Sequence, residues 1–258
     1  MQAAEAVGID VGGSSIKGCL VNVSDGAISG GIERIESPTG FRPEAVLKSV
    51  ADLAERLGGA ATVGVGFPAV VADGLLLTDP TSHEWPGWKG LDIAGELRRL
   101  TDRDVSVAND ADVAALAEHA FGAARGAGGT VLVLTLGTGI GSGLISEGRL
   151  VPNIELGRIF LAGEREVAEE QCSARILSEQ NLGWPEFAER LQRYLTHIER
   201  FVAPGLIVIG GAVSSEGESF LPLIETRARL VTADLLGDAG MVGAALIGAE
   251  RHGSGSGG

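Results

Sequence analysis

Cysteine is nearly absent from this sequence: Cys19 and Cys172 are the only two among 258 residues. Neither belongs to a CxxC pair or to a cluster of cysteine and histidine, so we expect no disulfide framework and no zinc site. Aromatic residues are also scarce, at 4% of the chain. The core must therefore be built mainly from aliphatic side chains.

Positively charged residues are also few: the chain has 20 Lys and Arg but 34 Asp and Glu, so its formal net charge is −14. This balance argues against non-specific binding to nucleic acid or to a membrane surface. No apolar run reaches membrane-spanning length. The first residues, MQAAEAVGID, also lack the basic and apolar parts of a secretory signal. We therefore expect a cytoplasmic protein with no nucleic-acid and no membrane partner.

Glycine, in contrast, is abundant, with 40 residues, and it repeatedly ends short apolar segments. This pattern predicts β-strands that end in turns, the first three forming an antiparallel meander. Between them, apolar residues recur at helical spacing. The predicted strands lie within residues 6–37, 61–71, 104–110, 129–151 and 205–214, and the predicted helices cover residues 43–57, 91–100, 111–125, 164–181, 185–202 and 239–251.

The order of these segments repeats along the chain. Each half begins with a strand, a glycine turn and a second strand, and continues into helix and strand. This repetition predicts an α/β fold of two related domains around a cleft. We place an N-terminal domain at 1–108 and a C-terminal domain at 109–238, with helix 239–251 packing back on the first domain. Residues 252–258, ending in GSGSGG, are expected to form a flexible tail.

Three glycine turns at strand ends are candidates for phosphate binding: GIDVGGSSIKG (8–18), LTLGTGIGSG (134–143) and VIGGAVS (208–214). Without a Cβ, glycine lets backbone N–H groups converge on an anion, and hydroxyls or a lysine can add to them. The alternative is that these are tight hairpin turns. None matches the Walker pattern or the dinucleotide-binding GxGxxG pattern, which disfavours a dehydrogenase. The candidate phosphate- and donor-binding residues are Asp10, Gly12, Gly13, Ser14, Lys17, Gly137, Thr138, Gly139, Gly141, Gly210 and Gly211.

Asp10 lies immediately before the first glycine turn. A carboxylate next to phosphate groups is unfavourable unless a cation lies between them. We therefore expect Asp10 to hold Mg²⁺, through water, where the ion neutralises the donor phosphates. The alternative role for Asp10 is to cap the turn.

Asn109 and Asp110 lie between a predicted strand and a predicted helix. Asp110 could be the N-cap of that helix, which is a common use of Asp. A carboxylate at this junction is also well placed to accept a proton from a hydroxyl group. Phosphoryl transfer to an alcohol needs one such base, oriented on the attacking oxygen. Asp110 is therefore the candidate catalytic residue.

Four motifs together resemble the ROK sugar kinases, in particular their polyphosphate glucokinase branch. They are GIDVGGSSIKG, VANDADVAALAEHAFGA, LTLGTGIGSGLISEGRLVPNIELG and IVIGGAVS, and the resemblance extends over residues 7–247. It implies the actin-like ATPase (ribonuclease H-like) fold and a homodimer. It further implies that the first loop, the GTGIG turn and the GGxxS turn lie at the phosphoryl donor, which is ATP or inorganic polyphosphate used with Mg²⁺. By the same resemblance Asn109 orients a sugar and Asp110 removes the proton from its hydroxyl.

The sequence departs from this family at the sugar-binding motif. The ExGH motif reads ELGR, so that Glu155 matches the sugar-binding Glu while Arg158 replaces the His. Phe160 stands where the polyphosphate glucokinases have another sugar-facing Glu, and the loop TDPTSHEWPGW (78–88) contains no Asn. The zinc-binding cysteine cluster of many ROK proteins is also missing, as it is in the polyphosphate branch. Arg158 is longer than His, permanently charged and suited to carboxylate or phosphate.

These changes predict an acceptor other than glucose, namely a modified sugar, an amino sugar or a cyclitol, because hydroxyl-binding partners have been lost. Two alternatives remain open. One is a sugar-sensing ROK-like protein that binds without catalysis, against which stand the retained Asp110 and the glycine turns. The other is a degenerate kinase in which Arg158 pairs with Glu155 or Asp110 and fills the acceptor pocket.

Overall fold

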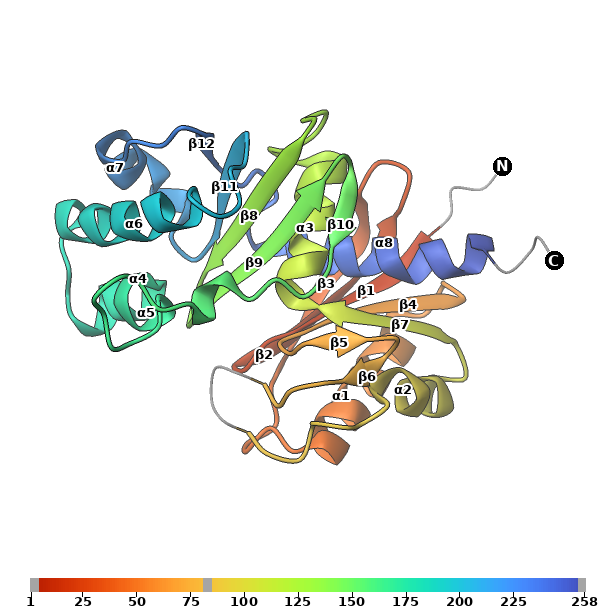
Figure 1. Cartoon of the computed structure of the whole chain (residues 1–258). Helices are drawn as coiled ribbons and strands as arrows, with labels where there is room; N and C mark the ends of the chain where they lie inside the picture. Colours follow the sequence, from red (N-terminus) through yellow and green to blue (C-terminus); the bar gives the residue numbers. More distant parts are fainter. Residues whose placement is uncertain (1–4, 81–84, 255–258) are drawn as a thin grey trace. The chain divides into compact units, whose positions relative to one another are not determined.

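The computed structural model describes residues 5–80 and 85–254, and the chain forms two compact units (Figure 1). Unit 1 takes in the chain up to Ala117 and from Asp238 onward, and unit 2 comprises Glu118–Gly237. The division falls inside helix α3 (Asp110–Phe121). The boundary predicted from the sequence, at 108/109, lies at the start of the same helix.

Unit 1 is built on a five-stranded sheet in the order β3-β2-β1-β4-β7. The first three strands pair antiparallel, as the predicted meander requires, and β1, β4 and β7 pair parallel. The strands are β1 (Glu5–Val11), β2 (Ser15–Asn22), β3 (Ala27–Glu36), β4 (Thr62–Phe67) and β7 (Asp104–Asn109), with helices α1 (Pro43–Leu57) and α2 (Ile93–Thr101) and a small hairpin of β5 (Val71–Ala72) and β6 (Leu75–Leu76).

The two faces of the unit 1 sheet are covered by different helices (Figure 1). One face carries the aliphatic side chains of β1 and β4, such as Val7, Ile9 and Val65, which pack with residues of α1 and α2. The other face carries Gly8 and Gly64, against which α8 (Ala239–Ser254) packs. A Cβ on either glycine would overlap the backbone of α8. The small residues of β1 and β4 thus allow the C-terminal helix to lie directly on this sheet.

Unit 2 repeats the same topology, with the strand order β10-β9-β8-β11-β12. An antiparallel hairpin sits on one side of β8, and two parallel strands sit on the other. The strands are β8 (Thr130–Leu136), β9 (Ile140–Ser146), β10 (Arg149–Val151), β11 (Leu206–Gly211) and β12 (Arg229–Thr232). The helices are α4 (Glu169–Cys172), α5 (Ala174–Glu179), α6 (Trp184–Ile198) and α7 (Gly217–Phe220), with 3-10 turns η1 (Leu156–Arg158), η2 (Ser214–Glu216) and η3 (Leu221–Leu223), while η4 (Leu236–Asp238) leads into α8.

The single helix predicted over 164–181 is wrong. The structure has two short helices, α4 and α5, separated at Ser173. Ser173 has extended backbone angles, and its hydroxyl accepts a hydrogen bond from the N–H of Ile176, so it caps the second helix. Residues before Glu169 form turns and an isolated bridge between Phe160 and Val167. Apolar spacing alone does not reveal such an internal cap.

The two ends of the described chain bear on other sequence predictions. Helix α8 continues to Ser254, so the predicted tail 252–258 overlaps the end of this helix, and the last part of the tail, 255–258, lies outside the described residues.

A search of the described residues finds no helix with the length and apolarity needed to span a membrane. Over the same residues no cluster of three or more His, Cys, Asp or Glu suits a metal ion. Cys19 and Cys172 are free and buried, and burial raises the pKa of each thiol to about 12.

Candidate active site

The carboxyl ends of the parallel strands of unit 1 bring two candidate carboxylates together. Asp10 is near the end of β1, and Asp110 follows the end of β7. Gly66 of β4 lies between them, since a Cβ built there would be 3.6 Å from Cα of Asp110 and 3.9 Å from Oδ1 of Asp10. Ligand sites of α/β sheets characteristically lie at this edge. Asp10 and Asp110 therefore lie on either side of Gly66 at one edge of the sheet.

The Asp10 carboxylate has an unusual environment. A Cβ on Gly240, at the start of α8, would lie 2.7 Å from Cγ of Asp10, so the helix backbone comes close to the carboxylate. Burial raises the pKa of Asp10, and the charge of Lys17 partly opposes that effect. Lys17 is the cross-strand partner of Asp10 on β2. Among the described residues, no hydrogen-bond donor to the Asp10 carboxylate is found, so this group still has the capacity to bind a cation.

Asn109 and Asp110 divide the work at the start of α3. Oδ1 of Asn109 accepts hydrogen bonds from the N–H groups of Ala111 (2.9 Å) and Asp112 (3.2 Å), and its side-chain amide donates to the carbonyl of Ala69. Asn109 is therefore the residue that caps the helix. Asp110 is the first residue of the helix, is half-buried, and accepts a hydrogen bond from the N–H of its neighbour Ala111 at 2.8 Å. The capping role considered for Asp110 in the sequence is filled by Asn109.

The first glycine turn is a tight, exposed connection between β1 and β2. The N–H of Gly12 donates to the carbonyl of Ser15 at 3.0 Å, and the hydroxyl of Ser37 donates to the carbonyl of Gly12 at 2.5 Å. Gly13 and Ser14 are exposed at the tip, and Lys17 points from the same face of the sheet as Asp10. The turn is thus held from within unit 1 while its tip stays accessible.

In unit 2 the other two glycine turns lie at the same edge of one sheet. Gly137–Gly139 joins β8 to β9, and Gly210 and Gly211 end β11, the parallel neighbour of β8. Gly211 has φ of 82°, and a Cβ there would overlap the backbone of Leu136. Gly137 faces open space. Gly141, on β9 opposite Thr135, continues the same hairpin.

The tip of the Gly137–Gly139 turn offers hydrogen-bond donors. The N–H of Gly137 is used internally, donating to the carbonyl of Gly139 at 3.0 Å. Within residues 5–80 and 85–254, the N–H groups of Thr138 and Gly139 have no protein acceptor, and Thr138 is exposed. These two N–H groups and the hydroxyl of Thr138 are available to hydrogen-bond an anion.

The altered sugar motif is the short turn η1, which is fastened to β9. The hydroxyl of Ser142 donates to the carbonyl of Ile154 and accepts from the N–H of Leu156 at 2.9 Å. Glu155 precedes η1 and Arg158 ends it, with the Arg158 N–H donating to the carbonyl of Glu155. Phe160 follows with 60% of its surface exposed. A large exposed aromatic side chain at this position is available to contact a ligand.

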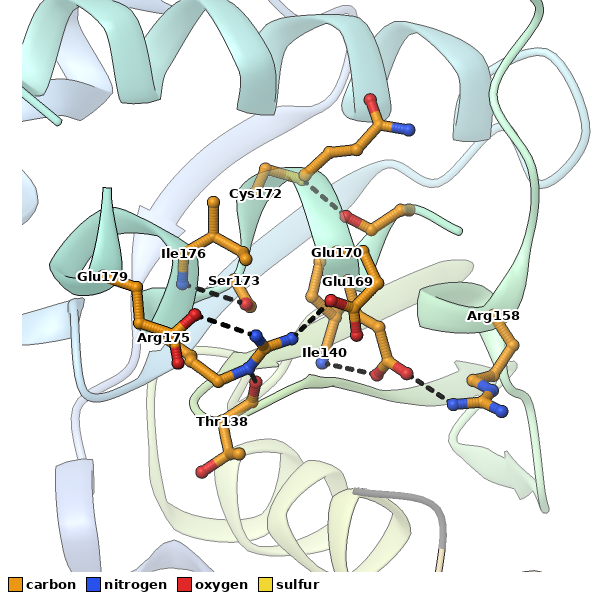
Figure 2. A network of polar contacts seen from close by, with 12 residues as sticks. Thr138, Ile140, Arg158, Glu169, Glu170, Cys172, Ser173, Arg175, Ile176 and Glu179 are labelled. Atoms are coloured by element: carbon orange, nitrogen blue, oxygen red, sulfur yellow. Dashed lines mark hydrogen bonds and ion pairs between the residues drawn. The ribbon is translucent and has the colours of Figure 1, made fainter. Parts of the chain in front are cut away.

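Arg158 forms an ion pair with Glu169, a residue that the sequence analysis did not single out. Nη1 of Arg158 lies 2.5 Å from Oε1 of Glu169, whose other oxygen accepts from the N–H of Ile140 at 3.3 Å (Figure 2). Glu169 is buried, whereas the Arg158 side chain is 45% exposed. Ile140 directly follows the Gly137–Gly139 turn, so this carboxylate contacts both the sugar motif and the glycine turn.

Arg175 is a second residue that the sequence analysis missed. Its Nε donates to the carbonyl of Thr138 at 3.1 Å, and the guanidinium also pairs with Glu170 and Glu179 (Figure 2). Its backbone N–H donates to the carbonyl of Gly137. The hydrogen bond to Glu170 is the main cause that raises the pKa of Arg175. Arg175 thus holds the glycine turn from behind while its own charge is compensated.

The described part of the loop 78–88 serves the packing of unit 1. Oδ1 of Asp79 accepts from the N–H groups of Lys89 and Trp88, and these hydrogen bonds lower the pKa of Asp79. The indole of Trp88 is fully buried and donates to the carbonyl of Phe41 at 2.9 Å. Residues 81–84 of this loop, which the sequence analysis expects to lack the family's Asn along with the rest of 78–88, lie outside the described residues.

The structure therefore brings the predicted residues into two groups. Unit 1 holds Asp10, Gly12, Gly13, Ser14, Lys17, Asn109 and Asp110, and unit 2 holds Gly137, Thr138, Gly139, Gly141, Glu155, Arg158, Gly210 and Gly211. Glu169 and Arg175 do not belong to any of the motifs identified in the sequence. The signal that points to Glu169 is steric, because a Cβ on Gly139 would overlap its Oε2.

Comparison with known proteins decides the family. The sequence pattern described as the ROK family matches residues 6–159. The chain belongs to the ROK family. It is 37% identical over 240 residues to a polyphosphate glucokinase of Mycobacterium tuberculosis (strain CDC 1551 / Oshkosh), an alignment that covers 93% of this chain and 89% of that protein.

Solved structures of ROK proteins agree in fold. A polyphosphate/ATP-glucomannokinase from Arthrobacter sp. strain KM superposes with a TM-score of 0.89 at 39% identity, covering 96% of this chain and 100% of that one. A ROK family glucokinase from Streptomyces griseus, in complex with glucose and AMPPNP, has a TM-score of 0.83 at 23% identity, with 96% and 100% coverage. The predicted family and the predicted actin-like ATPase fold of the α/β class are confirmed.

Proposed function

We propose that this ROK protein transfers a phosphoryl group from ATP or inorganic polyphosphate to a hydroxyl group of glucose or a glucose-like acceptor, with Asp110 as the general base. The observation that carries the proposal is the division of labour between Asn109 and Asp110. Asn109 supplies the cap of α3, and Asp110, the first residue of that helix, follows the carboxyl end of β7 at the edge of the sheet where β1 carries Asp10.

The coarse part of this function is the enzyme class. The protein is a sugar kinase, a phosphotransferase with an alcohol group as acceptor, as its ROK membership and its similarity to polyphosphate glucokinases indicate. A sugar-sensing protein without catalysis is the less favoured alternative, because Asp110 and all three glycine turns are retained.

Asp110 fits the role of base by position. It begins a helix whose N-terminal N–H groups stabilise negative charge, and it is half-buried rather than fully exposed. A base within reach of the acceptor hydroxyl accepts its proton as the oxygen attacks the donor phosphorus. Asn109 retains one amide N–H beyond its bond to Ala69, and we assign that donor to the acceptor sugar.

Asp10 fits the proposed Mg²⁺ site. Partial burial raises the pKa of its carboxylate, so a cation would favour the charged form. Bound Mg²⁺ supplies charge neutralisation for the donor phosphates. The residue that would hold it is Asp10, through water, with the exposed turn Gly12–Ser14 contributing donors to the phosphates.

The donor site that we propose in unit 2 consists of the two glycine turns. The N–H groups of Thr138 and Gly139 and the hydroxyl of Thr138 are available to phosphate oxygens. The neighbouring arginine, Arg175, is compensated by Glu170 and Glu179 and acts by holding the turn. The names of two similar proteins support both donors, since one is a polyphosphate glucokinase and the other a polyphosphate/ATP-glucomannokinase.

We further propose that glucose is not the preferred acceptor and that a modified sugar, an amino sugar or a cyclitol is. Glu155 keeps its place in the sugar motif, but Arg158 replaces a His and Phe160 places an apolar wall where the related enzymes have a Glu. The pair that Arg158 forms with Glu169 speaks against the degenerate alternative, which needs Arg158 to pair with Glu155 or Asp110.

The proposed function is tested with a matrix of acceptors and donors. Sugars, amino sugars and cyclitols are each combined with ATP and with polyphosphate, in the presence of Mg²⁺, and phosphorylated product is measured. We expect turnover of at least one acceptor, with glucose among the poorer ones. Glucose turnover at ordinary kinase efficiency would contradict the acceptor proposal, and no turnover of any pair would contradict the kinase. A homodimer in solution is a further proposal that follows from the family resemblance, and a cytoplasmic location is one that follows from the composition of the sequence.

A further inference from the structure

Glu169 is the residue at which the two motifs of unit 2 meet. Only 7% of its surface is exposed, and its two carboxylate oxygens serve different partners (Figure 2). Oε2 accepts from the N–H of Ile140 at 3.3 Å, and Oε1 accepts from Nη1 of Arg158 at 2.5 Å. One buried carboxylate therefore contacts the end of the proposed donor turn and the last residue of the proposed acceptor motif.

Close packing at the same place supports this connection independently. A Cβ on Gly139 would overlap Oε2 of Glu169, and a Cβ on Gly157 would overlap the carbonyl oxygen of Ile140. Neither glycine has a positive φ, so both positions need glycine for close approach rather than for backbone freedom. The glycine turn contacts the Glu169 side chain, and the η1 turn contacts Ile140 at the end of the glycine turn.

The opposite charges of Arg158 and Glu169 strengthen the connection between the η1 turn and the Gly137–Gly139 turn. Arg158 carries a permanent charge on a long side chain, and it needs a partner to fix its direction. Glu169 is buried, so loss of Arg158 would leave its carboxylate without this ion pair in a poorly solvated place. The carboxylate would then rearrange, and its hydrogen bond to Ile140 would change with it. A disturbance at the acceptor motif thus reaches the donor turn through one side chain.

Resting on the proposed kinase function, we propose that Glu169 is a positioning residue that couples acceptor recognition to donor binding. Its ion pair holds the Arg158 guanidinium in the orientation that meets the acceptor. Its second oxygen holds Ile140, and with it the Gly137–Gly139 turn, in the conformation that binds the donor phosphates. Changes of Arg158 therefore alter donor affinity, although Arg158 lies on the acceptor motif.

The coupling is measured by calorimetric titration of the folded protein in buffer with Mg²⁺, using AMPPNP and tripolyphosphate as donor probes. The variants are Arg158→Ala, Glu169→Gln and the double variant, and Gln keeps the shape and an acceptor oxygen while removing the charge. We expect Arg158→Ala and Glu169→Gln each to weaken donor-probe binding about five- to tenfold. The double variant is expected to be no weaker than Glu169→Gln alone, because both changes break one link.

A matched control is available in the same unit, where Arg193 and Glu164 form an exposed ion pair at 3.1 Å. Glu164→Gln is expected to leave donor-probe affinity unchanged. Wild-type affinity in Arg158→Ala, or effects that simply add in the double variant, would overturn the coupling. A purely structural role would lower the melting temperature and the binding-competent fraction without changing the dissociation constant, and that result would also overturn it. If the wild type binds neither probe and turns over no acceptor, the proposed kinase function itself fails, and the coupling with it.

Discussion

Asn109 accepts two backbone hydrogen bonds at the start of α3, from the N–H groups of Ala111 and Asp112, and Asp110 follows it as the first helical residue. Asn109 caps the helix, and its neighbour Asp110 is the residue that we propose as the base. The other carboxylate of this edge, Asp10, is partly buried with a raised pKa and gains no hydrogen bond within the described residues. Its position costs stability, and a functional role explains why a carboxylate is present.

The capping role of Asn109 predicts a stability effect. Asn109→Ala removes the side-chain acceptor of the Asp112 N–H and one of the two acceptors of the Ala111 N–H, and should destabilise the protein by about 1 kcal/mol. For a protein of this size that corresponds to a lowering of Tm by about 2–4 °C. Thermal unfolding followed by circular dichroism measures it, with Asp110→Asn as the control, for which we expect a smaller change. Equal losses for the two variants would contradict the assignment of the cap.

The raised pKa of Asp10 predicts a stability effect of opposite sign. In the folded state the charged carboxylate is penalised by burial, so Asp10→Asn should raise Tm at pH 7. This gain is present above the folded-state pKa and disappears as the pH falls through that value toward the unfolded-state pKa. Phosphoryl transfer by the same variant should fall strongly, since the proposed cation site is lost.

Asp79 provides the control for this pH dependence, because hydrogen bonds from the N–H groups of Lys89 and Trp88 lower its pKa. Its contribution is present above the unfolded-state pKa and is lost as the pH falls through the lowered folded-state value. Asp79→Asn should therefore lower Tm at pH 7, with a difference that narrows on acidification. A stability loss in Asp10→Asn at pH 7 would be inconsistent with a carboxylate that burial penalises.

The element that connects the motifs of unit 2 is the hairpin of β8 and β9. Its tip is the Gly137–Gly139 turn, its second strand carries Ser142, and Ser142 fastens η1 with Arg158. The turn is held from below by two side chains that come from α4 and α5, Glu169 and Arg175. The rigid base and the accessible tip are the combination that a phosphate-binding turn requires.

Two glycines of this turn should respond differently to substitution. Gly139→Ala places a Cβ on Oε2 of Glu169, so this carboxylate must move and its hydrogen bond to Ile140 is lost; we expect a destabilisation of about 1 kcal/mol. Gly137→Ala meets nothing within 4 Å and should leave the free energy of unfolding nearly unchanged. Urea denaturation of both variants measures the difference. Similar destabilisation by the two alanines would show that Glu169 does not restrict the turn.

The η1 motif carries the prediction about acceptor choice. Arg158→His together with Phe160→Glu restores the pattern that the resemblance to the polyphosphate glucokinases leads us to expect. If the two residues exclude glucose, the double variant should use glucose with a higher kcat/KM, by about tenfold or more, since a hydroxyl-binding partner is regained. Steady-state kinetics with glucose and with the best alternative acceptor measures the change. No gain for glucose would remove this motif from the explanation of specificity.

Both units of the whole molecule have the same strand order, with an antiparallel hairpin followed by two parallel strands. The sequence predicted this duplication because local signals are strong: the helix expected over 43–57 is α1, with bounds Pro43–Leu57, and the glycine turns mark the strand ends. What the sequence could not reveal are contacts between distant positions. The bond of Glu169 to Ile140 spans 29 residues, and its ion pair with Arg158 spans 11.

The elements that the sequence predicts wrongly, or does not predict, also depend on contacts that a local pattern does not contain. The break at Ser173 depends on a side-chain cap that competes with continuation of the helix, and apolar spacing does not report it. The strand β12 and the β5–β6 hairpin are short and were not predicted, since they are stabilised by pairing with neighbours rather than by their own sequences. The candidate site was predictable where glycine and acidic residues mark it, and unpredictable where ordinary charged residues support it.

The central claim is phosphoryl transfer with Asp110 as the base, and one measurement tests it most directly. The rate of sugar phosphate formation is compared between the wild type and Asp110→Asn, with the acceptor and donor that the wild type uses best. We predict that kcat falls by about 10²–10⁴-fold while donor affinity and Tm stay close to the wild-type values. An Asp110→Asn enzyme that keeps the wild-type kcat would contradict the role of Asp110 as the base.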